Sequence, residues 1–127
     1  MGKKILLVED NKTLSDMYKD VLNDEGYEVI TVGDGLEAEK IIRAEPWDLL
    51  LLDIMLPKMD GISILSDMKK SGVINNRPVI IISNVKEPKL LEQTAILGVK
   101  DYYVKAELSL DLLLEKISSY LSQSQNE

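Results

Sequence analysis

Two short runs of purely apolar residues constrain this chain more than any other feature of its sequence. They are LLLL at 49–52 and VIII at 79–82, and neither alternates with polar residues as a strand with one wet face does. Strands that are buried on both faces occur in parallel sheets with helices packed on either side. Both runs are therefore predicted to be inner strands of such a sheet.

Three further segments, KKILLVED, YEVITV and DYYVK, also resemble strands. Five longer segments with apolar residues at three- and four-residue steps alternate with the strands and predict helices. Their apolar stripes are Leu14, Met17, Tyr18, Val21 and Leu22; Ala38, Ile41 and Ile42; Ile62, Leu65 and Met68; Leu90, Leu91, Ala95 and Ile96; and Leu112, Leu113, Ile117, Tyr120 and Leu121. This order predicts a doubly wound (βα)₅ α/β fold, a five-stranded parallel sheet flanked by five helices with flavodoxin-like topology.

The length of 127 residues suits one domain, which we expect to span 1–122 and to be followed by a polar tail at 123–127. The chain has no cysteine, so neither disulfides nor thiolate metal sites can form, and a cytoplasmic location is the simplest expectation. No window approaches the length of about 20 apolar residues that a membrane-spanning helix needs.

The formal net charge of −7 limits the partners that this domain can bind directly. Binding to nucleic acids and to anionic membranes depends on lysine and arginine, so we expect neither. Histidine is also absent, so any phosphohistidine, imidazole base or histidine ligand has to come from a partner.

Polar side chains follow four of the predicted strands. Glu9 and Asp10 follow the first, Asp53 the third, Ser83 ends the fourth and Lys105 ends the fifth. The carboxyl ends of parallel strands meet at one edge of a sheet, which is where ligands bind. Three converging carboxylates require a divalent cation or raised pKa values, and an all-oxygen site suits Mg²⁺. A lysine and a hydroxyl beside such a site suit a phosphoryl group.

Each of these residues also has a simpler interpretation when it is taken alone. Acidic residues at strand-to-helix turns often serve only as helix N-caps, and an isolated lysine is usually a surface charge. Caps and solvated charges would not place all five side chains at corresponding strand ends. The joint placement therefore favours a functional site.

Four motifs in this order resemble those of response-regulator receiver domains, which act in two-component signalling. The resemblance is to receivers of the chemotaxis-regulator type. ILLVEDN holds the paired acids, and DIMLPKMDG holds the aspartate with proline four and glycine eight residues later. VIIIS holds the hydroxyl, and DYYVK holds an aromatic residue and the lysine. The resemblance extends over nearly the whole chain.

The resemblance implies that Asp53 is a phosphoacceptor and that the donor is a histidine kinase or a histidine phosphotransfer protein. Mg²⁺ would be held by Asp10, Asp53 and the backbone carbonyl of Met55, with Glu9 acting mainly through a water molecule. Such a domain is no enzyme beyond assisting its own phosphorylation and dephosphorylation. It would be a monomer or a weak, phosphorylation-dependent dimer.

The same resemblance implies how the signal leaves the site. Lys105 would contact one phosphoryl oxygen, and Ser83 would bond to another after phosphorylation. Tyr102, favoured over Tyr103 as the residue that faces the fourth helix, would follow the movement of Ser83. The surface of the fourth helix, fifth strand and fifth helix would then change. Which kinase acts on the chain, which target it controls and whether it belongs to a longer regulator stay open.

The sequence departs from the family pattern close to the site. Ala106 stands where the family usually has proline, which puts the aim of Lys105 in question. Asn84 replaces a smaller residue, and Met55 and Val85 are apolar and cannot position an attacking water. We therefore expect slow self-dephosphorylation.

Three other functions remain as alternatives. A flavodoxin-like cofactor binder would need a phosphate loop where EDNKT offers acids, and a phosphatase with an aspartate nucleophile would carry a second acid where Met55 stands. A degenerate receiver that acts only as a protein-interaction module would not need the complete set of polar residues. Lys86, Lys89 and Lys100 are expected to be solvated charges.

Overall fold

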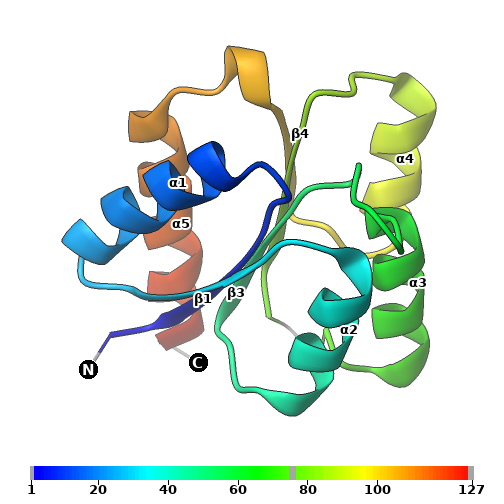
Figure 1. The fold of residues 1–127 in the computed structure, drawn as a ribbon, viewed down its shortest axis with the longest axis horizontal. Helices are drawn as coiled ribbons and strands as arrows, with labels where there is room; N and C mark the ends of the chain where they lie inside the picture. The colour runs from blue at the N-terminus through cyan, green and yellow to red at the C-terminus, as the bar shows by residue number, and fades with distance from the viewer. Residues whose placement is uncertain (1, 75–76, 126–127) are drawn as a thin grey trace.

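The computed structural model describes residues 2–74 and 77–125, with the backbone alone at 123–125. Strands and helices alternate along the chain from β1 to α5 (Figure 1). The strands are β1 (Lys4–Val8), β2 (Glu28–Val32), β3 (Leu49–Leu52), β4 (Val79–Ser83) and β5 (Asp101–Val104). The helices are α1 (Lys12–Asp24), α2 (Gly35–Ala44), α3 (Gly61–Ser71), α4 (Pro88–Ile96) and α5 (Leu110–Gln125), with a 3₁₀ turn, η1 (Lys105–Glu107), after β5.

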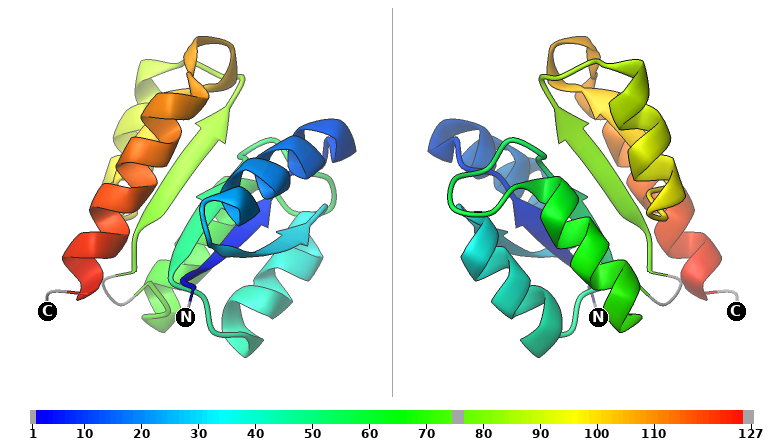
Figure 2. Two further views of the ribbon diagram at one scale, coloured as in Figure 1. Left: turned by 90° about the vertical axis from the view of Figure 1, so that its left-hand side faces the viewer. Right: turned by 90° about the vertical axis from the view of Figure 1, so that its right-hand side faces the viewer.

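All strand pairs are parallel, and the strand order in the sheet is β2-β1-β3-β4-β5. Helices α1 and α5 cover one face of the sheet, and α2, α3 and α4 cover the other (Figures 1 and 2). Every residue of β3 and β4 is buried, as the apolar runs predict. The doubly wound (βα)₅ fold is thus confirmed.

Local sequence signals explain where several helices begin and end. The N-cap side chains of Asn11, Asp34 and Asp60 accept hydrogen bonds from the first turns of α1, α2 and α3 at 3.0, 2.9 and 2.9 Å. Helix α3 ends at Gly72, whose φ of 74° lies in the left-handed region that favours glycine. These caps set the helix starts beside the carboxyl ends of the strands.

Each face of the sheet has its own apolar core. The larger core fills the space under α2, α3 and α4, and the other fills the space under α1 and α5. Trp47 is buried in the larger core, just before β3, and its indole N–H donates to the carbonyl of Ile42 at 3.1 Å. The Arg77 guanidinium lies 3.8 Å from the centroid of the Trp47 ring and forms a cation–π contact.

The five helices form where the apolar stripes predict them, but five residues of those stripes are exposed. They are Met17, Leu91, Ala95, Ile96 and Leu112. The small hydroxyl residues Ser15 and Thr94 are buried instead. Thr94 satisfies its hydroxyl within its own helix by donating to the carbonyl of Leu91 at 3.1 Å. A polar residue that bonds to its own helix can pack inward while an apolar neighbour faces water.

The C-terminal helix is longer than the predicted domain boundary implies. Helix α5 continues to Gln125, into the segment 123–127 that we expected to be a tail, and 126–127 lie outside the described residues. Within the described part of the chain, no helix is both long and apolar enough to cross a membrane.

Candidate functional site

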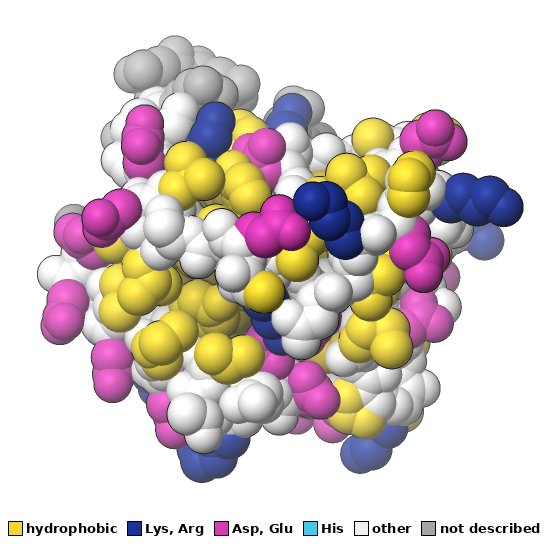
Figure 3. Space-filling model, turned by 90° about the horizontal axis from the view of Figure 1, so that it is seen from above, with side chains coloured by type: hydrophobic (Ala, Val, Ile, Leu, Met, Phe, Trp, Pro, Cys, Tyr) yellow, Lys and Arg dark blue, Asp and Glu magenta, His cyan; other side chains and the backbone are white. Residues whose placement is uncertain are grey.

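The site lies at the carboxyl ends of the strands, at the upper end of the molecule in Figure 1. Val8 pairs with Leu52, and Ser83 pairs with Val104. The residues next to these pairs therefore reach the same edge of the sheet. The strand order reverses between β1 and β3, and such a switch point is where open parallel sheets bind ligands. Seen from above, this end carries acidic side chains around its rim and apolar side chains on both sides (Figure 3).

Asp53 is held at the centre of this edge by contacts to both of its carboxylate oxygens. Its side chain is almost fully buried, and its backbone N–H donates to the carbonyl of Val8 at 3.0 Å. Lys105 Nζ donates to Asp53 Oδ2 at 2.8 Å, and the backbone N–H of Met55 donates to Oδ1 at 3.1 Å. The carboxylate is thereby fixed in orientation.

Lys105 bridges Asp53 to Glu9, whose Oε1 lies 2.6 Å from Nζ. The other Glu9 oxygen accepts from the backbone N–H of Asn11 at 3.0 Å. Burial raises the pKa of Glu9, although Lys105 and Asn11 oppose this effect. Burial works against the charge on Lys105, but its contacts with Asp53 and Glu9 outweigh burial and raise its pKa. Lys105 therefore stays protonated at neutral pH.

Three carboxylates form a group that could hold a metal ion. Glu9, Asp10 and Asp53 each offer an oxygen, and these oxygens lie within 4.8 Å of one another. Asp10 is exposed, whereas Glu9 and Asp53 are buried. Glu9 Oε1 is buried, and the Lys105 ammonium lies 2.6 Å from it. The group has oxygen ligands only, and three carboxylates beside a single lysine leave it net acidic, which fits Mg²⁺.

The loop from Asp53 to α3 is held by two close backbone approaches. A Cβ on Gly61 would lie 2.8 Å from Ile54 Cα and 2.9 Å from the carbonyl oxygen of Asp53. A Cβ on Gly35 would lie 1.7 Å from the carbonyl oxygen of Met59. Only glycine fits at either position, so both residues are needed to hold the loop that follows Asp53.

The middle of this loop is a tight turn that an ion pair joins to α2. The N–H of Met59 donates to the carbonyl of Pro57 at 2.8 Å across Lys58, whose φ is 70°. Lys58 Nζ lies 3.6 Å from Asp34 Oδ2. This turn is the structural basis of the PKMDG part of the motif. The Met55 side chain is 62% exposed beside the site.

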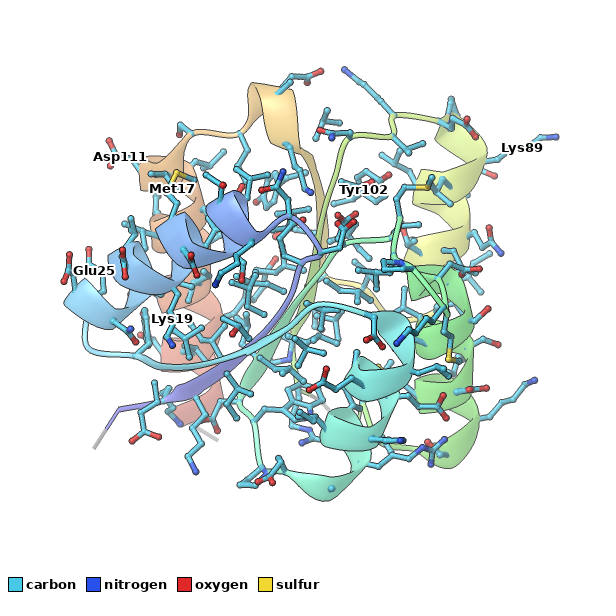
Figure 4. All side chains as sticks on the ribbon, in the orientation of Figure 1. Met17, Lys19, Glu25, Lys89, Tyr102 and Asp111 are labelled. Atoms are coloured by element: carbon cyan, nitrogen blue, oxygen red, sulfur yellow. The ribbon has the colours of Figure 1, made fainter. Side chains whose placement is uncertain are left out.

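Ser83 and Tyr102 meet on the loop that follows β4. Ser83 is fully buried, and its Oγ accepts from the N–H of Val85 at 3.2 Å. The Tyr102 hydroxyl donates to the carbonyl of Val85 at 2.5 Å. As predicted, Tyr102 is the tyrosine on the α4 side of the sheet (Figure 4), whereas Tyr103 packs on the α5 side.

Replacement of the family's proline by Ala106 does not misdirect Lys105. The described residues contain no cis peptide bond, so Lys105 and Ala106 are joined by a trans bond. The chain forms η1 at this point, and Lys105 Nζ still reaches both Glu9 and Asp53. Asn84, at the start of the next loop, is exposed.

An ion pair between Lys86 and Glu107 lies near the site and has no signal in the sequence. Lys86 is exposed, as expected of a solvated charge, but its Nζ also lies 3.3 and 3.2 Å from the two carboxylate oxygens of Glu107. Lys89 does extend away from the body of the molecule (Figure 4). A pair that spans 21 residues leaves no periodic signal in the sequence.

Comparisons with known proteins agree with this geometry. The family model for the response regulator receiver domain matches residues 5–118. Sporulation initiation phosphotransferase F of Bacillus subtilis (strain 168) is 33% identical over 126 residues, which are 99% of this chain and 99% of that protein. The transcriptional regulatory protein CrdR of Helicobacter pylori is 34% identical over 122 residues, which are 96% of this chain and 56% of that protein.

A solved structure shows the same fold. A receiver domain protein described as CheY-like, from Methanospirillum hungatei JF-1, superimposes with a TM-score of 0.91 at 28% identity, covering 99% of this chain and 98% of that one. Receiver domains act in two-component phosphorelays, where they are phosphorylated on an aspartate. The matches, with the acidic edge of the sheet and its lysine, show that this chain belongs to the response regulator receiver domain family.

Proposed function

We propose that the chain is a phosphorylation-dependent signalling switch that accepts a phosphoryl group on Asp53 from a histidine kinase or a histidine phosphotransfer protein. The observation that carries this proposal is the 2.8 Å contact between Lys105 Nζ and Asp53 Oδ2, inside a group of three carboxylates. The contact places a positive charge beside the carboxylate to which a phosphoryl group would be added.

In the transfer, an Asp53 oxygen attacks the phosphorus of a phosphohistidine. An O–P bond forms, the N–P bond breaks, and the imidazole leaves with its bonding electrons and takes up a proton. Lys105 moves from the carboxylate to a phosphoryl oxygen, where it offsets the charge of the transition state. The donor imidazole has to come from the partner because this chain has no histidine.

The residues that would hold Mg²⁺ are Asp10, Asp53 and the backbone carbonyl of Met55, with Glu9 acting mainly through a water molecule. The bound ion would supply positive charge next to the phosphoryl oxygens. Lys105 contacts the same two buried carboxylates, Glu9 and Asp53. It therefore holds these groups in place for the incoming cation.

The output of the switch would be a change in the surface formed by α4, β5 and α5. An acyl phosphate adds nearly two negative charges and new acceptor oxygens at Asp53. The Ser83 hydroxyl would bond to one of these oxygens and release its contact with the N–H of Val85. Tyr102, bonded to the carbonyl of the same Val85, would follow that loop. A two-state equilibrium of this surface is thereby shifted.

The unit that performs this function is proposed to be the domain at 1–122, working in the cytoplasm. It is proposed to act as a monomer or as a weak dimer that depends on phosphorylation. It catalyses nothing beyond its own phosphorylation and dephosphorylation.

The direct test is the intact mass of the protein after incubation with acetyl phosphate. The wild type is expected to gain the mass of one phosphoryl group with Mg²⁺ and none with a chelator. Asp53→Ala is expected to gain none under either condition. Asp10→Asn keeps the acceptor but loses a metal ligand, and it should react much more slowly at the same Mg²⁺ concentration.

Two results would contradict the proposal. Modification of Asp53→Ala to the same extent as the wild type would mean that another residue is the acceptor. Absence of Mg²⁺ binding in a titration, together with no mass gain, would favour the degenerate receiver that acts only as an interaction module.

The phosphorylated form is expected to be long-lived. Met55 is exposed beside the site and Val85 lies on the loop after Ser83, and neither side chain can orient an attacking water. Met55→Asn should shorten the lifetime of the phosphoryl group, because an amide can bond to water. The lifetime is measured by intact mass after removal of the donor, and a half-life of only seconds in the wild type would contradict this prediction.

A further inference from the structure

The ion pair between Lys86 and Glu107 joins the two loops that flank the site. Lys86 lies three residues after Ser83, in the loop between β4 and α4, and Glu107 lies two residues after Lys105, at the end of η1. Their charged atoms are 3.2 and 3.3 Å apart. The two side chains line the same groove, of about 220 Å³, together with residues of α4, β5 and α5.

On its η1 side, the pair supports the segment that aims Lys105. The turn is only three residues long, and its closing hydrogen bond, from the N–H of Leu108 to the carbonyl of Lys105, is long at 3.4 Å. Ala106 provides no ring to restrict the backbone, as a proline would. The contact from Glu107 to Lys86 is an additional restraint on the direction in which Lys105 leaves β5.

On its other side, the pair supports the loop that carries Ser83. Lys86 directly follows Val85, whose N–H donates to Ser83 Oγ and whose carbonyl accepts from the Tyr102 hydroxyl. A shift of the backbone at Lys86 would therefore act on Val85, whose N–H is bonded to Ser83 and whose carbonyl is bonded to Tyr102.

We propose that Lys86 and Glu107 form a positioning pair that holds the loop of Ser83 and the turn of Lys105 at a fixed separation, so that both side chains can contact one phosphoryl group. This inference rests on the proposed function, since it assumes that Asp53 is phosphorylated. Neither residue touches the acceptor, and both act through Ser83 and Lys105.

The size of the effect follows from the exposure of the pair. The two side chains are 66% and 60% exposed, so water and salt screen their attraction. Breaking such a pair should slow phosphorylation of Asp53 by about two- to fivefold, the range that exposed ion pairs supply. The effect should vanish at a salt concentration of about 1 M, where the screening length is only about 3 Å.

The test is a double-mutant cycle on the full chain, with acetyl phosphate as the donor at saturating Mg²⁺. The variants are Lys86→Met, Glu107→Gln, both together, and the charge exchange Lys86→Glu with Glu107→Lys. Glu39→Gln, which breaks the partly exposed Glu39–Arg43 pair of α2 (3.6 Å), is the matched control. The rate constant is measured by intact mass at low and high salt, and Mg²⁺ affinity is measured separately.

The expected result is a two- to fivefold slower rate in each single variant at low salt, no further loss in the double variant, and recovery in the charge exchange. Mg²⁺ affinity should be unchanged, because the pair does not touch the three carboxylates. Equal rates in all variants, additive losses in the double variant, or the same loss in Glu39→Gln would overturn the inference. If the wild type takes up no phosphoryl group, the proposed function itself fails.

Discussion

Lys105 explains how three carboxylates can lie together at the end of one sheet. Its ammonium contacts Glu9 and Asp53 at 2.6 and 2.8 Å, so the formal charge of the group is −3 + 1 = −2 with Asp10 included. The sequence predicts the repulsion among the acids and the need for a cation. It does not show that a partly buried lysine already lies between two of the acids, because that contact depends on where the fifth strand ends relative to the first.

Gly61 is the residue at which a single methyl group should disturb Asp53 most. Gly61→Ala would place its Cβ 2.9 Å from the carbonyl oxygen of Asp53 and 2.8 Å from Ile54 Cα. Both are backbone atoms that cannot rotate away. We expect the free energy of unfolding to fall by about 1–3 kcal/mol, as overpacked sites do, and phosphorylation of Asp53 to slow.

Gly72→Ala is the control for this prediction. No atom lies within 4 Å of a Cβ at Gly72, but its φ is +74°. This variant should lose about 1–2 kcal/mol from backbone strain alone while it keeps the wild-type rate of phosphorylation. Urea unfolding and intact mass separate the two cases, and a wild-type phosphorylation rate in Gly61→Ala would contradict the packing argument.

Among the helices, α4 shows why an apolar stripe is not always the buried face. Its sequence has apolar residues on two sides, and the side that packs inward contains Leu90, Thr94 and Leu97. Thr94 is polar, so a stripe drawn through apolar residues alone leaves it out and includes the exposed Leu91 and Ile96 instead. The outer face then appears as exposed apolar surface on the helix that is proposed to carry the signal.

Two isoleucines on different helices test this assignment. Ile117 of α5 is fully buried, whereas Ile96 at the end of α4 is 72% exposed. Ile117→Ala should lower the free energy of unfolding by about 2–5 kcal/mol because it leaves a cavity. Ile96→Ala should change it by less than about 0.5 kcal/mol. Similar losses in both variants, measured by urea unfolding, would mean that α4 packs as the stripe predicts.

The inner strands were the part of the fold that the sequence predicted best. LLLL and VIII are buried on both sides, so no choice of face has to be made, and any residue of the run fits the core. Helix α1 was predicted less well, since Met17 is exposed and Ser15 buried. A helix has only one buried face. When a hydroxyl residue lies on that face, the apolar residues alone no longer mark the face correctly.

At the scale of the whole molecule, tyrosines that are buried or partly buried should make the fold sensitive to alkaline pH. Burial raises the pKa values of Tyr18, Tyr102, Tyr103 and Tyr120. The unfolded chain loses these protons at about pH 10, while the folded chain retains them. The stability contribution is therefore complete below about pH 10 and is lost as the pH rises further. The raised pKa of Lys105 acts in the same direction.

Urea unfolding between pH 8 and pH 11 measures this loss. Tyr120, whose hydroxyl donates to Asp101, is the residue to change. Tyr120→Phe should lower stability at pH 8 and differ less from the wild type above pH 10. A wild-type stability that stays constant over the whole range would contradict the prediction.

The polar site was predicted from its position in the chain, but its connections were not. Placing Glu9, Asp53, Ser83 and Lys105 at strand ends is enough to bring them to one edge. The contacts between Lys105 and Asp53 and between Lys86 and Glu107 span 52 and 21 residues. They depend on the shapes of two loops, which local sequence patterns do not specify.

The position of Trp47 determines what its fluorescence can report. It is the only tryptophan, and it lies just before β3, whereas Asp53 directly follows the strand. At about 3.3 Å per residue, roughly 20 Å separate Trp47 from Asp53. The indole, buried and covered by Arg77, should keep the same emission spectrum when the acceptor is modified and should redden only when the core opens. The emission of Trp47 should therefore report on folding of the core, and it can be recorded while Asp53 is being phosphorylated.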